Sequence, residues 1–355
     1  MRNKVNVLLF LLVSVLAGIL IPGSNIRSVS AQGGAAVYQW KFHSYLPVAE
    51  PDHSVANARF CEMVEKNTKG RVKMTLFPAG AIVQSPDLMN ATRDGIIEMS
   101  SWDCAYGAGS VPVLGVVSGM PMSWRNQREL VEVLYDFGLS ELSREAYAKY
   151  GVHLLGHNAS SACGLGMISK KPIRNLNDLK GLKARVGPAF IEFWRGLGCS
   201  TVSLPLTELY MAISTGTIDA AAFDWIATSV FKVSEVAKYA VLPSQIGCTT
   251  AHIVVSPKAW DSLPDDLKTI ISLTHRDWAA WMERYFHPYV RGSHEKAMND
   301  LKAKGVKLIT LSEADQAKMF QVAFKMWDAA AAKDPLSAKA VDIVKGYYRK
   351  VGRIK

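Results

Sequence analysis

Residues 95–103 read GIIEMSSWD, and residues 216–224 read GTIDAAAFD. Each stretch opens with a glycine that can end the preceding helix, and it continues with residues typical of a strand buried on both faces. Ligands of open α/β sheets bind at the carboxyl ends of such strands. The repeat therefore predicts two similar α/β lobes that each present an aromatic residue and an aspartate, Asp103 or Asp224, to a shared cleft. A chance likeness between two short windows is the alternative.

The segments around the repeat alternate between strand and helix patterns. Apolar and polar residues alternate over 38–43 and over 72–76, which predicts strands, and the apolar residues of 52–70 fall at helical spacing. Ser85-Pro86 supplies a cap and a first-turn proline for another helix. The predicted fold class is therefore α/β with mostly parallel sheets.

The first 31 residues are predicted to be a secretory signal peptide. Two basic residues precede an apolar run over 5–21, and Val29-Ser30-Ala31 gives a small-x-Ala cleavage pattern. An uncleaved membrane anchor is the alternative, because the apolar run is just long enough to cross a bilayer. Cleavage near Ala31 would leave the mature chain in the periplasm.

Composition argues against several classes of protein. The formal net charge of +10 favours anionic partners, but the basic residues are scattered, which argues against nucleic acid. The five cysteines are widely spaced without a C-x-x-C pair, so they predict neither a metal site nor a disulfide framework. Nucleophile elbows, zinc-protease helices and complete nucleotide-binding loops are absent from the sequence.

His157-Asn158 follows the apolar stretch VHLLG, where the end of a strand could enter a cleft. A lone histidine is more often structural than functional. A secreted hydrolase that uses the cleft carboxylates Asp103 or Asp224 together with His157 is the alternative function, although no spacing indicates an activated nucleophile.

The longest motif covers residues 175–225, NLNDLKGLKARVGPAFIEFWRGLGCSTVSLPLTELYMAISTGTIDAAAFDW. It resembles the central signature of the substrate-binding subunits of tripartite ATP-independent periplasmic (TRAP) transporters, the DctP-type solute receptors. The likeness extends over nearly the whole mature chain, including KGRVKMTLFPAG and AWDSLPDDLKTII. The matching positions in the motif are Asp178 to Val186, Leu197, Gly198, Pro205, Glu208, Tyr210, Ala212, Gly216 and Asp219.

The resemblance implies a two-lobed periplasmic binding protein fold with crossing hinge strands and a long helix that spans both lobes. We expect lobe 1 at 36–161 plus about 250–290, and lobe 2 at about 162–249 plus 291–355. The resemblance also implies a receptor rather than an enzyme, which binds a small organic acid anion and delivers it to the membrane permease subunits of a TRAP transporter.

Arg185 is the residue to which the resemblance assigns the ligand carboxylate. A guanidinium group matches a carboxylate through two parallel hydrogen bonds, which a lysine cannot reproduce. Because an unpaired charge is costly to bury, we expect the pair to form only when the cleft closes on an anion. An exposed or internally paired arginine is the alternative.

Aromatic residues suggest the remaining walls of the pocket. Tyr45 follows the first predicted strand, and Trp102 ends a strand of one lobe. Phe223 or Trp225 lies in the other lobe, although any of these residues could belong to the core. An apolar pocket with few polar groups favours a monocarboxylate such as a 2-oxo, 2-hydroxy or aromatic acid. A dicarboxylate would need a second cation, which the sequence does not identify.

No cofactor is expected. The resemblance implies that metal-assisted relatives hold a cation with a glutamate and with a glutamine on a crossing strand. In this chain Ala222-Phe223 and Gly164 fall near those positions. Asp224 could supply a hard oxygen ligand, so it is the candidate if a divalent or sodium ion accompanies the ligand, an arrangement that the sequence does not favour.

Overall fold

The computed structural model describes residues 36–159, 164–291 and 294–354. The predicted signal peptide with its cleavage site near Ala31 lies outside these residues, as does Cys163. Residues from Val37 onward form one structural unit.

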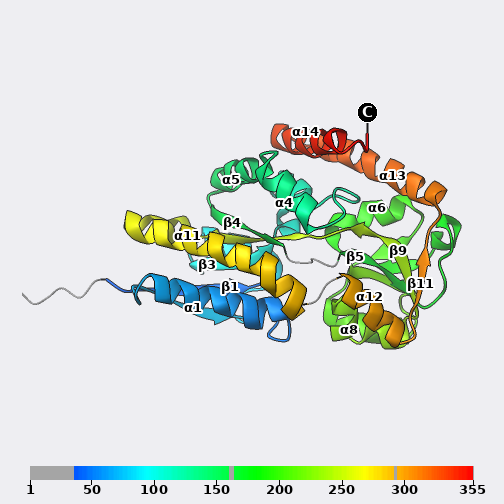
Figure 1. The fold of residues 1–355 in the computed structure, drawn as a ribbon, viewed down its shortest axis with the longest axis horizontal. Coiled ribbons are helices and arrows are strands. Elements are labelled where there is room, and N and C mark those ends of the chain that lie inside the picture. Colours follow the sequence, from blue (N-terminus) through cyan, green and yellow to red (C-terminus); the bar gives the residue numbers. More distant parts are fainter. Residues whose placement is uncertain (1–35, 160–163, 292–293, 355) are drawn as a thin grey trace, which may run out of the picture. The chain divides into compact units, whose positions relative to one another are not determined.

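The first sheet has the strand order β2-β1-β3-β10-β4 (Figure 1). β1 pairs in parallel with β2 and β3, whereas β10 pairs antiparallel with β3 and β4. β10 comes from a distant part of the sequence and is inserted between two strands of the N-terminal half. The strands are β1 (Tyr38–Ser44), β2 (Val72–Phe77), β3 (Met99–Asp103), β4 (His153–Ala159) and β10 (Thr250–Val255).

The second sheet has the strand order β11-β9-β5-β8-β6-β7. β8 pairs in parallel with β6, and β6 with β7, whereas β5 pairs antiparallel with β8 and β9. Each sheet therefore combines parallel strands with an inserted antiparallel one, and the predicted α/β class is confirmed. The strands are β5 (Leu165–Ser169), β6 (Lys183–Arg185), β7 (Ser200–Val202), β8 (Ala220–Asp224), β9 (Tyr239–Ile246) and β11 (Lys307–Thr310).

Helices cover both faces of the two sheets. α1 and α11 pack on one face of the first sheet, and α2 and α5 supply the apolar cluster on its other face. The α-helices are α1 (Ala58–Asn67), α2 (Leu88–Arg93), α3 (Val113–Val117), α4 (Gln127–Tyr135), α5 (Leu139–Tyr150), α6 (Ile191–Gly196), α7 (Leu209–Ser214), α8 (Ala227–Val230), α9 (Val233–Val236), α10 (Pro257–Asp261), α11 (Asp265–Trp281), α12 (His294–Ala303), α13 (Glu313–Ala331) and α14 (Pro335–Lys350).

The chain crosses between the sheets at several places. β4 of the first sheet leads to β5 of the second, and β9 of the second leads to β10 of the first. The helical run that begins with α11 continues through the π-helical segment η7 (Met282–Arg291), which contains Pro288. Trp278 in this run packs in the core of the first sheet, and Leu301 of α12 packs in the core of the second.

The two repeated stretches become buried strands, as their composition predicts. All residues of β8 are buried, and those of β3 are buried up to the partly exposed Asp103. Along β8 the faces alternate, because Ala222 packs with α6 and α13, whereas Phe223 packs with α7 and α12. The three alanines of this strand thus allow helices to approach both faces of the sheet.

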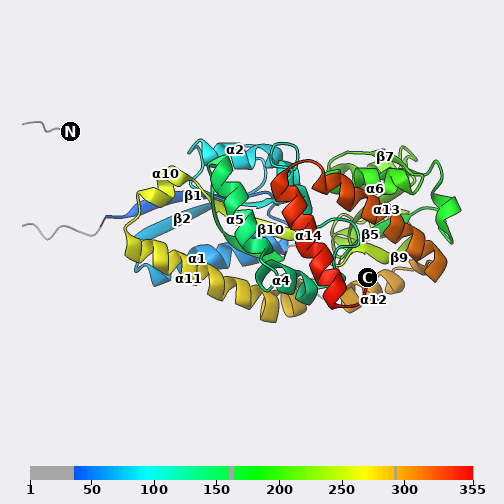
Figure 2. The ribbon, with the colours of Figure 1, turned by 90° about the horizontal axis from the view of Figure 1, so that it is seen from above.

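The division of the C-terminal part between two lobes stays a prediction. α14 belongs to the segment expected in lobe 2, and it packs against α13 of that segment. The same helix also packs against α3, α4 and α5, and Figure 2 shows it running alongside α4 and α5. Trp327 of α13 donates from Nε1 to the carbonyl oxygen of Pro121 at 3.0 Å. This hydrogen bond links α13 to the segment between α3 and α4.

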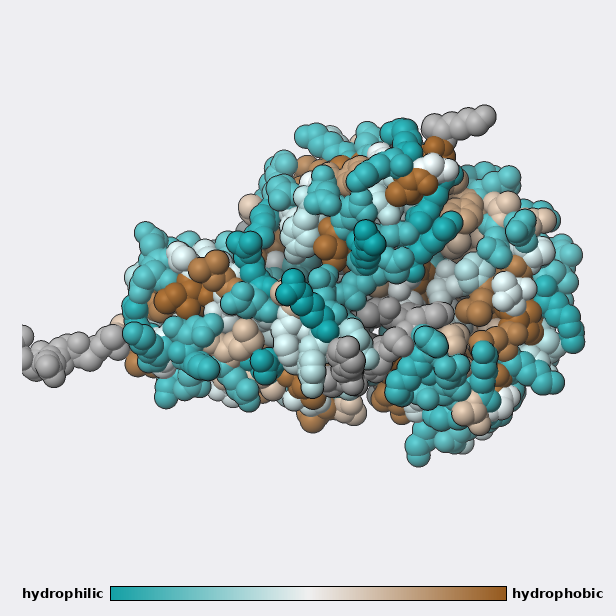
Figure 3. Space-filling view, viewed as in Figure 1, coloured by the Kyte–Doolittle hydropathy of each residue, from teal (hydrophilic) through white to brown (hydrophobic). Residues whose placement is uncertain are grey.

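The outer surface is mainly hydrophilic on the face in Figure 3, where apolar residues form small separate groups. Val48, Met211 and Leu273 are exposed, but they come from different elements of the fold. Within the residues that the structure describes, no helix is both long and apolar enough to cross a membrane.

Candidate ligand-binding cavity

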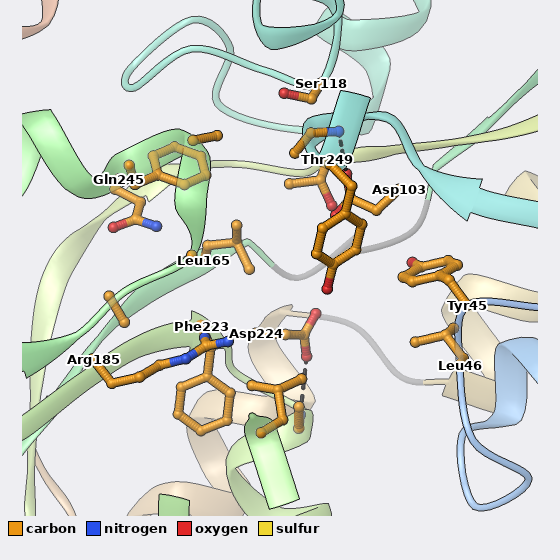
Figure 4. A pocket seen from close by; sticks show the side chains of 18 of the residues that line it. Tyr45, Leu46, Asp103, Ser118, Leu165, Arg185, Phe223, Asp224, Gln245 and Thr249 are labelled. Carbon is orange, nitrogen blue, oxygen red and sulfur yellow. Dashed lines mark hydrogen bonds between the residues drawn. The ribbon is translucent and has the colours of Figure 1, made fainter. Parts of the chain in front are cut away.

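A cavity of about 170 Å³ lies where strand ends of both sheets meet (Figure 4). Its walls are mostly apolar and aromatic, and its polar side chains come from several elements. The side chains that border it include Tyr45, Leu46, Glu50, Asp103, Tyr106, Ser118, Leu165, Arg185, Phe190, Leu206, Phe223, Asp224, Gln245 and Thr249.

The aspartates of the repeated stretches both border this cavity. Asp103 ends β3, and its Oδ1 accepts a hydrogen bond from the backbone N–H of Ala105 at 2.9 Å. Asp224 ends β8, and its Oδ1 accepts from the N–H groups of Ile226 at 2.7 Å and Ala227 at 3.0 Å. Each carboxylate caps the turn that follows its strand. The repeat thus corresponds to the same local structure in both sheets.

Arg185 ends β6 and is half-buried at the edge of the cavity. Its Nε donates to the carbonyl oxygen of Leu204 at 3.1 Å. Among the residues that the structure describes, no carboxylate forms an ion pair with it. Burial lowers the pKa of this guanidinium, and the nearby Tyr106 opposes that effect. The site therefore holds a partly desolvated positive charge that no carboxylate of the described residues neutralises.

Tyr45 and Phe223 border the cavity as the sequence suggests, but Trp102 and Trp225 do not. Trp102 is fully buried on the other side of β3 and meets the ring of Tyr147 edge to face at 6.4 Å. A Cβ atom at Gly107 would lie 2.6 Å from the Trp102 ring, so this glycine makes room for the indole.

Trp225 is also fully buried, although it directly follows the cavity residue Asp224. Its Nε1 donates to the Ser244 hydroxyl at 2.9 Å. Its ring lies against Gly166, where a Cβ atom would be 1.9 Å from the indole. Trp225 therefore packs against β5 and β9 on one face of the second sheet, and it does not border the candidate cavity.

His157 and Asn158 lie at the end of β4 and border a separate cavity next to α4, α5 and α11. The ring of His157 packs edge to face against His252 with 4.5 Å between the ring centres. Burial, reinforced by His252, lowers the pKa of His157 well below its usual value, so the ring is neutral. The structure thus does not bring His157 together with the carboxylates that the hydrolase alternative requires.

Several polar cavity residues were not predicted from the sequence. Gln245 lies on β9, which pairs with β5, and Gly164 directly precedes β5. The side-chain oxygen of Gln245 accepts a hydrogen bond from Trp194 Nε1. Its Nε2 has no partner among the described residues. Tyr106 lies on the 3₁₀ segment η3 (Cys104–Gly107), just after the strand-end aspartate. The position of Tyr106 after the repeat is the signal that could have identified it.

The described residues contain no group of three histidine, cysteine, aspartate or glutamate side chains placed to hold a metal ion. In Asp224, the candidate metal ligand, Oδ1 already accepts two backbone hydrogen bonds. A cation beside the ligand stays an untested alternative.

Known proteins resemble this chain over most of its length. The family model described as bacterial extracellular solute-binding protein, family 7, matches residues 42–334. The monocarboxylate 2-oxoacid-binding periplasmic protein of a Nostoc species is 23% identical over 337 residues, which cover 94% of this chain and 90% of that protein.

Solved structures have the same fold. A TRAP transporter solute-binding protein from Bordetella bronchiseptica, with calcium and picolinate in its site, matches with a TM-score of 0.78, 21% identity and coverage of 89% of this chain and 93% of that one. One from Desulfovibrio salexigens with bound orotic acid matches with a TM-score of 0.76, 24% identity and coverage of 90% and 100%. The two-lobed fold predicted from the sequence is confirmed. The chain belongs to family 7 of the bacterial extracellular solute-binding proteins, the extracytoplasmic receptors of TRAP transporters.

Proposed function

We propose that this receptor binds a small monocarboxylate in the cavity between its two sheets, with Arg185 holding the carboxylate. The observation that carries the proposal is the free end of the Arg185 side chain. Because Nε is held by the Leu204 carbonyl, the two terminal nitrogens are oriented and available to donate two parallel hydrogen bonds to an arriving carboxylate.

The charges around the cavity favour one carboxylate over two. Arg185 is the only basic side chain among the described residues that border it. Glu50, Asp103 and Asp224 border the same space, so a second ligand carboxylate would meet acidic groups. The relatives support this class, since the Nostoc protein is named for monocarboxylate 2-oxoacids and the Desulfovibrio structure contains orotic acid.

The apolar walls account for the rest of the ligand. Phe223, Phe190 and Leu165 border the cavity, with Tyr45 on the side of the first sheet. Such walls suit a 2-oxo, 2-hydroxy or aromatic acid with a short carbon skeleton. Closure of the lobes about the crossing strands would exclude water and strengthen the pair between Arg185 and the carboxylate, and the closed form would then deliver the ligand to the permease.

The hydrolase alternative is not favoured, because His157 borders a different cavity from Asp103 and Asp224. The family consists of substrate-binding receptors, and no group next to the cavity carboxylates has the arrangement of an activated nucleophile within the described residues.

A thermal-shift screen of organic acids tests the proposal. A ligand that binds the native state raises the midpoint of thermal unfolding. Monocarboxylates and dicarboxylates of equal chain length should therefore differ in the midpoint shift that they cause. We expect monocarboxylates to stabilise the protein and to be recovered chemically unchanged, as shown by mass spectrometry. Stabilisation by dicarboxylates alone, or conversion of the bound acid, would contradict the proposal.

A further inference from the structure

Asp103 presents an unused oxygen to the ligand cavity. Its Oδ1 accepts from the N–H of Ala105, and no described residue donates to its Oδ2. The residue is only partly exposed and borders the same cavity as Arg185. Because the residue is partly exposed, this oxygen is open to water in the ligand-free protein, and a ligand that displaces that water has to supply a donor in its place.

Arg185 and Asp103 reach the cavity from different sheets. Arg185 ends β6 of the second sheet and Asp103 ends β3 of the first, and Figure 4 shows them on opposite sides of the space. The pKa of Tyr106 is affected by both charges, with Asp103 raising it and Arg185 lowering it. A ligand that reaches across the cavity from Arg185 would therefore meet the side on which Asp103 lies.

The charged side chains that border the cavity favour a ligand with a hydrogen-bond donor. Among the described residues that border it, one side chain is basic (Arg185) and three are acidic (Glu50, Asp103 and Asp224). Once the ligand carboxylate contacts Arg185, the other polar groups of the ligand face mostly hydrogen-bond acceptors. Asp224 already accepts two backbone N–H groups, whereas Asp103 accepts one, so Asp103 has the greater remaining capacity to accept a hydrogen bond from the ligand.

We propose that Asp103 determines the specificity of this cavity by accepting a hydrogen bond from a hydroxyl or ammonium group of the bound monocarboxylate. The inference rests on the proposed function, and it narrows the ligand class to hydroxy or amino acids. A 2-oxo acid is disfavoured, because its keto oxygen is an acceptor and would face the lone pairs of an ionised carboxylate.

Two triplets of matched ligands test the inference by calorimetry at pH 7.5: pyruvate, lactate and alanine, and phenylpyruvate, 3-phenyllactate and phenylalanine. Within a triplet only the group on the second carbon changes, so hydroxyl and ammonium donors are distinguished from each other and from the keto acceptor. We expect the donor-bearing members to bind about 10- to 100-fold more tightly than the oxo acid, as is usual for a hydrogen bond to a charged group.

Asp103→Asn is the informative variant, because the amide oxygen can still accept from Ala105 N–H while the amide nitrogen turns the ligand-facing acceptor into a donor. The preference for the donor-bearing acids should disappear or reverse in favour of the oxo acid. Asp334→Asn is the matched control, because Asp334 caps α14 through Leu336 and Ser337 and does not border the cavity. This control should keep the wild-type preference.

The outcomes separate the inference from the proposed function. If the oxo acids bind as tightly as their partners, or if Asp103→Asn keeps the wild-type preference, the role of Asp103 is wrong, while loss of binding in Arg185→Ala would still support the receptor. If no member of either triplet binds, or if Arg185→Ala binds them normally, the carboxylate site and the role of Asp103 are both wrong. Thermal unfolding of each variant checks that the fold is intact.

Discussion

The Nε atom of Arg185 donates a hydrogen bond to the carbonyl oxygen of Leu204 at 3.1 Å. This contact joins the end of β6 to the segment that follows β7, and it fixes the direction of the guanidinium without neutralising its charge. The orientation is therefore established before any anion arrives, which reduces the entropy that binding has to overcome.

Replacement of Arg185 should abolish carboxylate binding without harming the fold. We expect Arg185→Ala to weaken binding at least about 100-fold, because the ligand charge would lose its buried partner. Arg185→Lys keeps the charge but loses the paired donors, so its affinity should be intermediate. Calorimetry with the best acid from the screen measures both.

The matched control for this change is Arg195→Ala. Arg195 is an exposed arginine of α6 that pairs with Glu192 and does not border the cavity. Its removal should leave the affinity within about twofold of wild type, since exposed ion pairs contribute little. Equal loss of binding in both variants would mean that net charge, and not the Arg185 site, attracts the ligand.

The ionisation of Asp103 should make the ligand-free protein less stable as the pH rises. Burial raises the pKa of Asp103 from its ordinary value of 3.8 to about 6, although the Ala105 N–H opposes this. Between these two values the folded protein holds the proton more tightly than the unfolded chain. The free energy of unfolding therefore falls as the pH rises through this window, and the cost is complete above it.

Asp103→Asn removes that cost. We expect the unfolding free energy of the variant to exceed that of wild type by about 1–2 kcal/mol at pH 7.5 and to match it near pH 4. This difference is smaller than the full pKa shift implies, because water in the cavity screens the charge. Burial raises the pKa values of the neighbouring Cys104, Tyr106 and Tyr147, so these groups stay neutral over this range. Glu50 and Asp224 share the cavity and are unchanged in the variant. Urea unfolding measures the difference, and a gap that is the same at both pH values would exclude Asp103 as its cause.

Removal of divalent ions should not change ligand affinity. Asp224 Oδ1 is occupied by the N–H groups of Ile226 and Ala227, so we assign this residue to the turn that leads from β8 into α8. Asp224→Ala should cost about 1 kcal/mol of stability, whereas Asp224→Asn should cost less because the amide oxygen can still accept these two hydrogen bonds. Calorimetry with and without EDTA tests the metal directly. A loss of affinity with EDTA that calcium restores, and that Asp224→Asn no longer shows, would establish a cation at this site.

The two aromatic residues of the repeat should behave differently when they are changed. Trp102 is fully buried in the core, so Trp102→Phe should lower the unfolding free energy by about 1–2 kcal/mol and leave the affinity nearly unchanged. Phe223 borders the cavity, so Phe223→Leu should weaken binding several-fold. Urea unfolding and calorimetry on both variants give the comparison. A larger loss of affinity in Trp102→Phe than in Phe223→Leu would reverse the assignment.

The sequence pattern predicted those structural features that depend on residues close together in the chain. The burial of β3 and β8 and the aspartates at their ends follow from residues close together in the chain. The capping of the next turn by a strand-end aspartate is likewise a contact over two or three residues. Such features depend on backbone preferences that neighbouring residues carry with them.

The family motif singled out Arg185, and the structure places this residue at the end of the short strand β6. The sequence pattern did not identify Gln245, because a glutamine on a crossing strand has no distinctive local pattern. It also did not identify Tyr106, for which the position just after the repeat was the only local signal. These residues reach the cavity only because β9 and η3 are brought beside β6 and β8 by the pairing of distant segments.

The sequence by itself therefore determined the α/β class, the buried strands and the motif that contains Arg185, since these depend on local composition and spacing. Tertiary structure alone decided which side of each strand faces the ligand. Alternation separates the side chains of a strand into two sets but does not say which set meets a helix and which meets a cavity. Packing buried Trp102, Trp225 and His157 against neighbouring elements, whereas Asp103 and Arg185 border the same space, because helices cover both faces of each sheet but leave these strand ends open.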